Sequence, residues 1–369
     1  MKGLKVIISG GGTGGHIFPA IAIANAIKAR QINAEILFVG AKGKMEMEKV
    51  PNAGYKIIGL WISGFQRRFV IKNFLFPLKV ILGLIKAGIL IRKFKPDVVI
   101  GVGGFASGLT LKIASFIGIP TIIQEQNSFP GMTNRLLSKS ATKICVAYEG
   151  MERFFPRKKI VFTGNPIRQN IISVDSNKEE AFSLFHLNPN KKSVLVLGGS
   201  LGALTINQTI ASMLPLFIKN DIQIIWQTGK NYFNFAKEEV LALNSNLFSV
   251  HSFITSMDLA YLVSDIIISR AGAITISELC VVAKPVILIP SPNVTDDHQT
   301  KNAKSLEIKN AAIMISDSEA TSKLAELLFE LIENNDLQQT LINNIKGLAI
   351  TNAADKIAEI AVTIAKIKN

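Results

Sequence analysis

The sequence contains few of the residues that build disulfide frameworks or metal centres. Its 369 residues include two cysteines and four histidines. Cys145 and Cys280 lie far apart within apolar runs, a pattern typical of buried, reduced thiols and of a reducing compartment. No His/Cys cluster has the spacing of metal ligands, so we predict no required metal. Glycines break the first apolar run at once, so no signal peptide is expected either.

Acidic residues are scarce in the first half of the chain. Residues 1–170 contain 25 Lys and Arg but only 7 Asp and Glu, whereas the remainder contains 16 against 20. An anionic partner is therefore expected to bind the N-terminal half. Charge alone leaves nucleic acid, an anionic membrane and a phosphorylated substrate as alternatives.

Repeats, low-complexity tracts and heptad arrays are also absent, and the chain is long enough for two domains of ordinary size. Continuous Val/Ile runs, typical of parallel strands covered on both faces, alternate with helical stretches. We expect strands at 5–9, 35–39, 56–60, 98–102, 120–124, 143–147 and 160–163, and then at 193–197, 222–227, 265–269, 285–289 and 312–315. Turn-forming residues between 163 and 168 separate the two series. We therefore predict an α/β protein with two Rossmann-like domains, residues 1–163 and 164–349, followed by a helix at about 350–369.

Residues 66–95 form an apolar segment crossed by lysines. About 20 mostly apolar residues are needed to span a bilayer, and a central lysine costs about 2.5–3.5 kcal/mol, so a spanning helix is not predicted. Lysines seven residues apart would form one stripe along a helix, as on a helix that lies on an anionic membrane. An ordinary surface helix is the alternative, and nucleic acid is disfavoured because aromatic and basic residues do not interleave. The residues predicted to contact the membrane are Lys72, Lys79, Lys86, Phe74 and Phe76.

A glycine-rich stretch, residues 10–15, follows the first expected strand and precedes a helix. Glycines let the backbone approach an anion, and the N–H groups at the start of the helix point toward it. Gly10, Gly12 and Gly15 also satisfy the dinucleotide pattern G-x-G-x-x-G, which requires a carboxylate at the end of the second strand. That strand ends in Gly40-Ala41-Lys42 instead, so a nicotinamide or flavin dinucleotide is disfavoured.

Two further glycine loops, 101–108 and 198–203, also follow expected strands. Carboxyl ends of parallel strands lie at one edge of a sheet, where ligands bind. Two such edges facing each other would form a cleft suited to a pyrophosphate and a polar sugar.

The second domain adds two polar segments, 269–278 and 296–303. Thr275 and Glu278 have the spacing of a capping box, and the alternative is that Glu278 accepts hydrogen bonds from a ribose. Residues 296–303 are dense in side chains that suit sugar recognition, with a solvated loop as the alternative. Asp296-Asp297 lacks the D-x-D spacing of a metal–nucleotide clamp.

The chain resembles the MurG family of bacterial glycosyltransferases in a set of motifs that occur in family order along nearly its whole length. They are GGGTGGHIFPA at 10–20, GVGGFASG at 101–108, QEQNSFPGMTNR at 124–135, GNPIR at 164–168, GGSLGA at 198–203, SRAGAITISE at 269–278 and DDHQTKNA at 296–303. The chain departs from the family pattern mildly, at Phe105 and Gln124.

The resemblance implies a GT-B fold, in which two Rossmann-like domains face each other across a cleft and the last helix packs back onto the first domain. It also implies inverting transfer of N-acetylglucosamine (GlcNAc) from UDP-GlcNAc to the C4 hydroxyl of the N-acetylmuramic acid (MurNAc) of lipid I, forming lipid II. UDP-GlcNAc is then a substrate, and no cofactor is expected. The expected partners are lipid I, an anionic membrane surface at the cytoplasmic face of the plasma membrane, and other cell-wall synthesis proteins, but not nucleic acid.

By position, the resemblance implies separate residues for the donor and the acceptor. The residues implied for the donor are Thr13, Gly14, Gly15, Asn127, Arg168, Ser200, Ile254, Ala273, Ile274, Thr275, Ile276, Ser277, Glu278 and Gln299. Those expected at the acceptor are Gly103, Gly104 and Ser107.

Inversion needs one base, and His16 beside the first glycine loop is the best-placed candidate because imidazole titrates near neutrality. The alternative is that His16 has a structural role as a helix cap, or that it donates a hydrogen bond to the phosphate of the acceptor. Glu125 is the second candidate base. The alternative is that it is an ordinary carboxylate at the end of a strand, with no catalytic role. Competing functions are a UDP-GlcNAc 2-epimerase, a transferase for soluble acceptors, and a non-catalytic nucleotide-sugar-binding adaptor.

Overall fold

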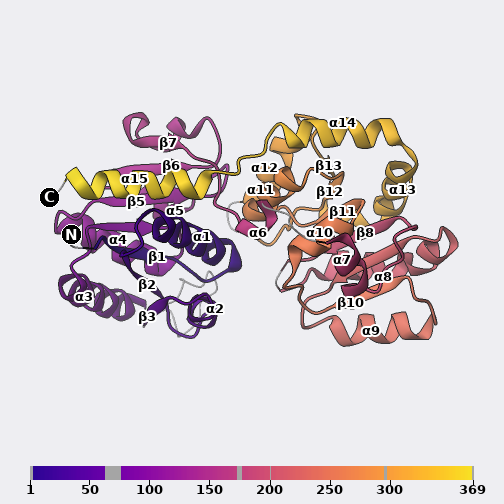
Figure 1. The fold of residues 1–369 in the computed structure, drawn as a ribbon, viewed down its shortest axis with the longest axis horizontal. Coiled ribbons are helices and arrows are strands. Elements are labelled where there is room, and N and C mark those ends of the chain that lie inside the picture. Colours follow the sequence, from indigo (N-terminus) through magenta and orange to yellow (C-terminus); the bar gives the residue numbers. More distant parts are fainter. Residues whose placement is uncertain (1–2, 63–75, 173–176, 200, 295–296, 368–369) are drawn as a thin grey trace. The chain divides into compact units, whose positions relative to one another are not determined.

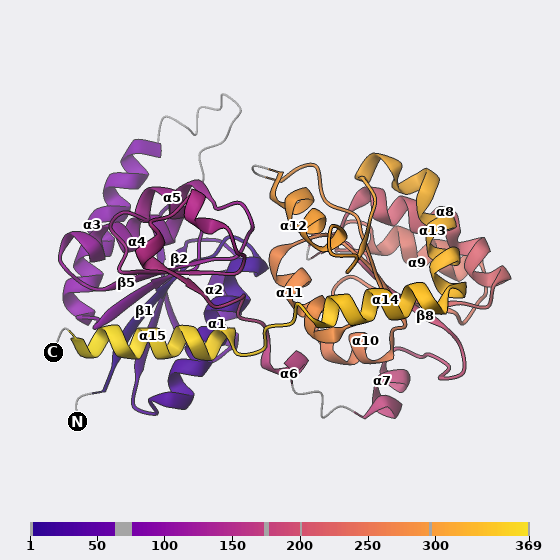
Figure 2. The same cartoon turned by 90° about the horizontal axis from the view of Figure 1, so that it is seen from above.

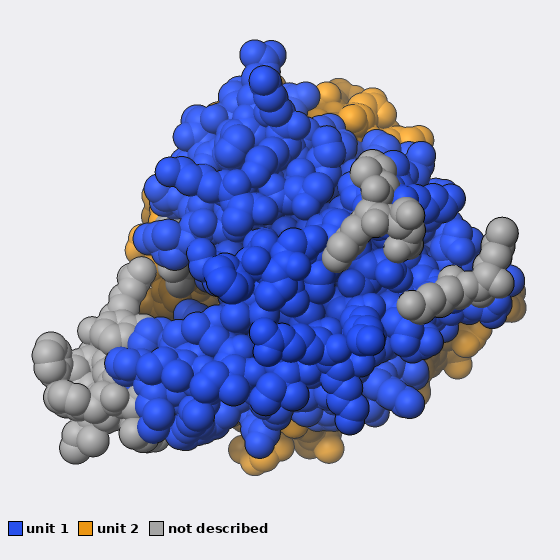
Figure 3. Space-filling model, turned by 90° about the vertical axis from the view of Figure 1, so that its left-hand side faces the viewer, with its two compact units in different colours: residues 1–168, 350–369 blue, residues 169–349 orange. Residues whose placement is uncertain are grey.

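The computed structural model describes residues 3–62, 76–172, 177–199, 201–294 and 297–367. The chain forms two compact units, residues 1–168 with 350–369 and residues 169–349, which are coloured separately in Figure 3. Each unit contains a parallel sheet with helices on it, which confirms the predicted α/β class.

The sheet of the first unit has the strand order β3-β2-β1-β4-β5-β6-β7, and all its pairings are parallel. Its strands are β1 (Lys5–Ser9), β2 (Glu35–Ala41), β3 (Lys56–Leu60), β4 (Val98–Gly101), β5 (Thr121–Glu125), β6 (Lys143–Val146) and β7 (Ile160–Phe162). The central strands are buried along almost their whole length because both faces are covered by apolar clusters.

The helices of this unit are α1 (Gly14–Arg30), α2 (Glu46–Asn52), α3 (Phe76–Phe94), α4 (Phe105–Phe116), α5 (Met132–Leu137) and α15 (Ala353–Ile367). Figures 1 and 2 show α15, at the end of the chain, lying beside α1. It contributes Ile357, Ala361 and Ile364 to the same buried cluster as Ile23 and Ile27 of α1. The last helix therefore completes the core of the first unit.

The sheet of the second unit has the order β10-β9-β8-β11-β12-β13, again with parallel pairings. Its strands are β8 (Ser193–Leu197), β9 (Gln223–Gln227), β10 (Phe248–His251), β11 (Ile266–Ser269), β12 (Val286–Leu288) and β13 (Ile313–Met314). Its helices are α6 (Gln169–Ile172), α7 (Lys178–Leu184), α8 (Leu204–Lys219), α9 (Phe233–Ala242), α10 (Met257–Val263), α11 (Ala273–Val282), α12 (His298–Glu307), α13 (Ala320–Glu333) and α14 (Asn335–Lys346).

The helix within the basic apolar segment is α3, which packs on α4. No helix of the described chain is both long enough and apolar enough to cross a membrane.

Candidate active site

The glycine loops of the first unit lie where the strand order reverses. Strands β1 and β4 are neighbours, with Ser9 opposite Gly101, and each is followed by a glycine loop and a helix. The two loops touch through their backbones, since a Cβ added at Gly104 would lie 2.7 Å from the Gly11 carbonyl oxygen. Ligands bind at such reversal points in open α/β sheets.

His16 lies in the first turn of α1, and its ring is oriented by the glycine loop. Its Nδ1 is 3.0 Å from the Gly11 carbonyl oxygen. Because a carbonyl only accepts, Nδ1 carries the proton and donates it, which leaves the lone pair on Nε2. A Cβ added at Gly103 would lie only 2.6 Å from that Nε2, and Gly103 has a φ of +103°. The structure thus brings two predicted site elements together, the His16 imidazole and the second glycine loop.

The carboxylate of Glu46, in α2, holds the first glycine loop from the other side. Its Oε2 accepts a hydrogen bond from Gly12 N at 2.8 Å, and its Oε1 accepts one from Ala41 N at 2.9 Å. Glu46 is buried, and a Cβ at Gly11 would overlap its carboxyl carbon. This residue was not predicted from the sequence. The dinucleotide pattern requires a carboxylate at the end of the second strand, and Glu46 lies five residues beyond the end of β2.

Glu125, at the end of β5, is buried and surrounded by donors. Its Oε1 accepts from the backbone and side-chain nitrogens of Asn127, and its Oε2 accepts from Gly131 N and Asn134 Nδ2. Burial raises the pKa of the carboxyl above its ordinary value, and the four hydrogen bonds oppose that shift. This geometry is that of an anchor for the loop that carries Asn127.

Two further predicted residues of this unit, Arg168 and Ser107, and Asn165 of the motif that contains Arg168 lie in three settings. Arg168 lies with its guanidinium carbon 5.3 Å from the ring centroid of Phe18 in α1. Asn165 links its motif to the strand end, since it accepts from Gln124 Nε2 and donates to the Gln126 carbonyl. Ser107 is completely buried behind Gly101, and its hydroxyl has no hydrogen-bond partner among the described residues. Ser107 thus lies beneath the loop, out of contact with solvent.

The second unit repeats the reversal at β8 and β11. Gln227, at the end of β9, joins two segments there, because its Nε2 donates to the Gly199 carbonyl at 3.2 Å and its Oε1 accepts from Ile254 N at 2.9 Å. The predicted donor residue Ile254 is therefore fixed beside the loop at 198–203. Gln227 was not expected from the sequence, where it looks like the last polar residue of a strand.

Helix α11 begins after Gly272 with no side-chain cap, so the capping box at Thr275 does not form. Glu278, one turn further along, is buried, and its Oε2 accepts from the Tyr261 hydroxyl at 3.3 Å. A buried carboxylate near the ends of the strands suits a ligand with hydroxyl donors.

Gln299, in the first turn of α12, is held by its amide oxygen, which accepts from Ser291 N at 2.9 Å. Its Nε2 donors consequently point away from that contact. Asn302, one turn on, is fully buried and donates to the Ala271 carbonyl at 3.5 Å, so it ties α12 to the loop before α11.

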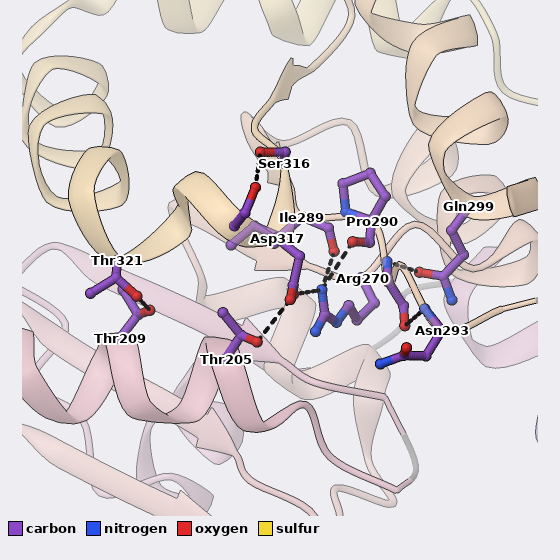
Figure 4. Close-up of polar contacts among 12 residues, drawn as sticks. Thr205, Thr209, Arg270, Ile289, Pro290, Asn293, Gln299, Ser316, Asp317 and Thr321 are labelled. Carbon is purple, nitrogen blue, oxygen red and sulfur yellow. Dashed lines mark hydrogen bonds and ion pairs between the residues drawn. The ribbon is translucent and has the colours of Figure 1, made fainter.

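Arg270 follows β11 and is occupied by protein groups (Figure 4). Its Nη1 donates to the carbonyls of Ile289 and Pro290 at 3.0 and 3.1 Å and forms an ion pair with Asp317 at 2.5 Å. Thr205, in α8, donates to the same carboxylate at 2.8 Å. Arg270 thus clamps the loops at one edge of the sheet.

Three predicted residues, Ser200, Lys72 and Phe74, lie outside the described residues. In α3, the Lys86 ammonium donates to the Gly59 carbonyl at 2.8 Å, and Lys79 lies over the Trp61 ring. Phe76 begins this helix and is half-buried. Lys79 and Lys86 thus lie toward the body of the unit, whereas Arg92 and Lys93 near the end of the helix are exposed. Most of the exposed face of α3 is apolar, formed by Leu78, Ile81, Leu82, Ile85 and Ile89.

No three His, Cys, Asp or Glu side chains converge to hold a metal ion in the described parts of the chain.

Comparison with known proteins places these motifs in context. The glycosyltransferase family 28 N-terminal domain matches residues 6–146, and the family 28 C-terminal domain matches residues 193–359. A protein of Flavobacterium psychrophilum is 53% identical over 97% of both chains and bears the name UDP-N-acetylglucosamine--N-acetylmuramyl-(pentapeptide) pyrophosphoryl-undecaprenol N-acetylglucosamine transferase.

Solved structures agree in fold. MurG of Acinetobacter baumannii has a TM-score of 0.76 and 27% identity over 98% of this chain and 99% of its own. A UDP-GlcNAc 2-epimerase from Neisseria meningitidis reaches a TM-score of 0.69 over 99% and 100%, but at 16% identity it shares the fold alone.

Proposed function

Because this chain belongs to glycosyltransferase family 28, and within it to the MurG transferases, we propose that it transfers GlcNAc from UDP-GlcNAc to the MurNAc of lipid I. The product is lipid II, the peptidoglycan precursor. The single observation that carries this function is the 53% identity over 97% of both chains to a transferase of that name. An epimerase of the same architecture has no comparable support.

The second unit is proposed to bind the donor. Glu278 would accept hydrogen bonds from the ribose hydroxyls, because its carboxylate is buried and already oriented by Tyr261. Gln299 would donate to a sugar hydroxyl through Nε2, since Ser291 N fixes its oxygen. We also propose the segment 273–278, Ile254 and Ser200 as donor-binding, together with Thr13–Gly15, Asn127 and Arg168 of the first unit.

His16 is the proposed base of the first unit. Its Nε2 takes the proton of the MurNAc C4 hydroxyl while that oxygen forms a bond to C1 of GlcNAc. The bond from C1 to the phosphate oxygen breaks on the opposite face, and its electron pair leaves with UDP. Backbone N–H groups at helix starts stabilise the departing charge. We propose that no metal is needed.

Glu125 is proposed to position Asn127 instead of acting as a base. A base must reach the proton that it removes, and the Glu125 oxygens already accept four hydrogen bonds in a buried site.

The acceptor lipid is proposed to reach the site from a membrane surface contacted by the first unit. The apolar outer face of α3 and the basic composition of residues 1–170 support this placement. We propose that the protein is peripheral on the cytoplasmic face of the plasma membrane.

A coupled assay tests the function. Purified protein is given UDP-GlcNAc with or without a lipid I analogue, and UDP release and lipid II are measured. We expect UDP release only with the acceptor and no loss of rate with EDTA. Acceptor-independent release, or formation of UDP-N-acetylmannosamine, would sink the transferase proposal. Loss with EDTA, restored by a divalent cation, would overturn the metal-free mechanism.

A further inference from the structure

One peptide group joins a buried carboxylate to the His16 imidazole. The carbonyl of the Gly11–Gly12 peptide accepts from His16 Nδ1 at 3.0 Å, and the N–H of the same peptide donates to Glu46 Oε2 at 2.8 Å. The order of groups is therefore carboxylate, amide, imidazole. We propose that Glu46 is a positioning residue that acts on the His16 base through this peptide; this inference rests on the proposed function.

The chemistry resembles that of a carboxylate bonded directly to a histidine, with an amide inserted between them. A negative charge on the N–H side polarises the amide, which makes its carbonyl oxygen a stronger acceptor. A stronger acceptor holds the proton on Nδ1, keeps the lone pair on Nε2, and stabilises the imidazolium that forms when Nε2 takes a proton.

The surrounding residues fix this arrangement. Glu46 is 1% exposed, and its other oxygen is held by Ala41 N at 2.9 Å, so the carboxylate cannot turn away from Gly12. Gly12 has a φ of +90°, and in this conformation its N–H can face α2. Residues other than glycine rarely adopt such a φ. The Gly11 position likewise has no room for a Cβ beside the carboxylate.

The charged groups near the start of α1 include Glu46, which acts through the peptide, and Arg168, which lies over the Phe18 ring. They have opposite effects on an imidazolium. Removal of the Glu46 charge should therefore make His16 harder to protonate, while removal of Arg168 should not.

The experiment compares wild type with Glu46→Gln, Glu46→Asp and the control Glu48→Gln. Glu48 lies in the same helix and is exposed, so the control makes the same charge change without touching the loop. For Glu46→Gln we expect the acid limb of the kcat/KM profile to move to lower pH by about one unit and kcat to fall by about tenfold. Glu46→Asp should keep the wild-type midpoint, and Glu48→Gln should keep both midpoint and rate.

A second measurement needs no turnover. Selective ¹⁵N-histidine labelling resolves four histidines, and His16→Asn assigns the His16 signal. We expect neutral His16 to carry its proton on Nδ1. In Glu46→Gln the titration midpoint of the ring should move to lower pH by about one unit, like the acid limb of the kcat/KM profile. A tautomer protonated at Nε2 would overturn the inference, as would an unshifted midpoint in Glu46→Gln or an equal shift in Glu46→Asp. Failure of the wild type to form lipid II would refute the proposed function alone, since the NMR titration still decides the role of Glu46.

Discussion

The exposed face of α3 gives a quantitative prediction about membrane binding. Ile81, Ile85 and Ile89 are 55%, 55% and 61% exposed and lie on one side of the helix at a spacing of four residues. We change all three to serine. Because the side chains are largely in water, the free energy of unfolding should change little, whereas the apolar area offered to a bilayer should fall sharply.

The magnitude follows from the exposed fractions. Fully burying an isoleucine side chain is worth about 1.5–3 kcal/mol, so insertion of the exposed half contributes about 1 kcal/mol per residue. Three residues give about 3 kcal/mol, and 1.4 kcal/mol is a factor of ten, so the partition coefficient should fall roughly 100-fold.

Sedimentation with vesicles that contain anionic lipid measures this coefficient. The matched control is Leu241→Ser with Ile308→Ser, two exposed apolar residues of the second unit, which should leave partitioning unchanged. If the α3 variant partitions like wild type, apolar insertion of α3 is refuted. If the wild type and the α3 variant lose vesicle binding equally in high salt, the contact is electrostatic and comes from basic residues elsewhere.

Further predictions concern the two units separately. Gly103→Ala should abolish turnover while UDP-GlcNAc still binds by calorimetry, because the new Cβ would lie 2.6 Å from His16 Nε2; turnover near the wild-type rate would contradict the assigned site. Glu278→Ala should raise KM for UDP-GlcNAc by about 10–100-fold with little change in kcat, since a hydrogen bond to a charged group is worth about 1.5–3 kcal/mol; an unchanged KM would remove Glu278 from the donor site. Arg270→Ala should destabilise the second unit by about 3 kcal/mol in urea, because it leaves the Asp317 charge without its cation; a loss below 1 kcal/mol would show that the clamp is dispensable. Burial raises the pKa of both cysteine thiols to about 12, so iodoacetamide at pH 8 should label them only after unfolding, and rapid labelling of the folded protein would contradict their burial.

The sheets were predictable because their strands are continuous apolar runs. Strands β1, β3 and β8 begin and end at the expected residues, and most others differ by one or two. Strand β10, Phe248–His251, was missed: it is a short edge strand whose apolar residues alternate with Ser249 and His251, so no continuous run marks it.

The site was predictable only where local sequence carries the geometry. Glycine loops were predicted after strands at 10–15, 101–108 and 198–203, and each of them contains glycines with positive φ, a conformation that other residues rarely adopt. Glu46 and Gln227 were missed because each binds a loop 27 to 34 residues away in sequence, although Glu46 also accepts from Ala41 N close by. No local pattern records such contacts.

The lysine stripe of α3 shows a second limit. The spacing of seven correctly grouped Lys79 and Lys86 on one side of a helix, yet it carries no information about which side faces water. The Gly59 carbonyl, in an adjacent strand, accepts from the Lys86 ammonium and holds that side chain against the unit, while Lys93, seven residues further on, is exposed.

The return of α15 to the first unit has a consequence for biosynthesis. The chain leaves the first unit after residue 168 and re-enters it at residue 350, so the second unit is inserted into the first. On the ribosome, the apolar side chains that pack against Ile357, Ala361 and Ile364 stay uncovered until the whole second unit has been made. The N-terminal unit is therefore the first to be translated and the last to be completed. A fragment ending at residue 168 should be prone to aggregation unless the α15 sequence is supplied, either fused or in trans.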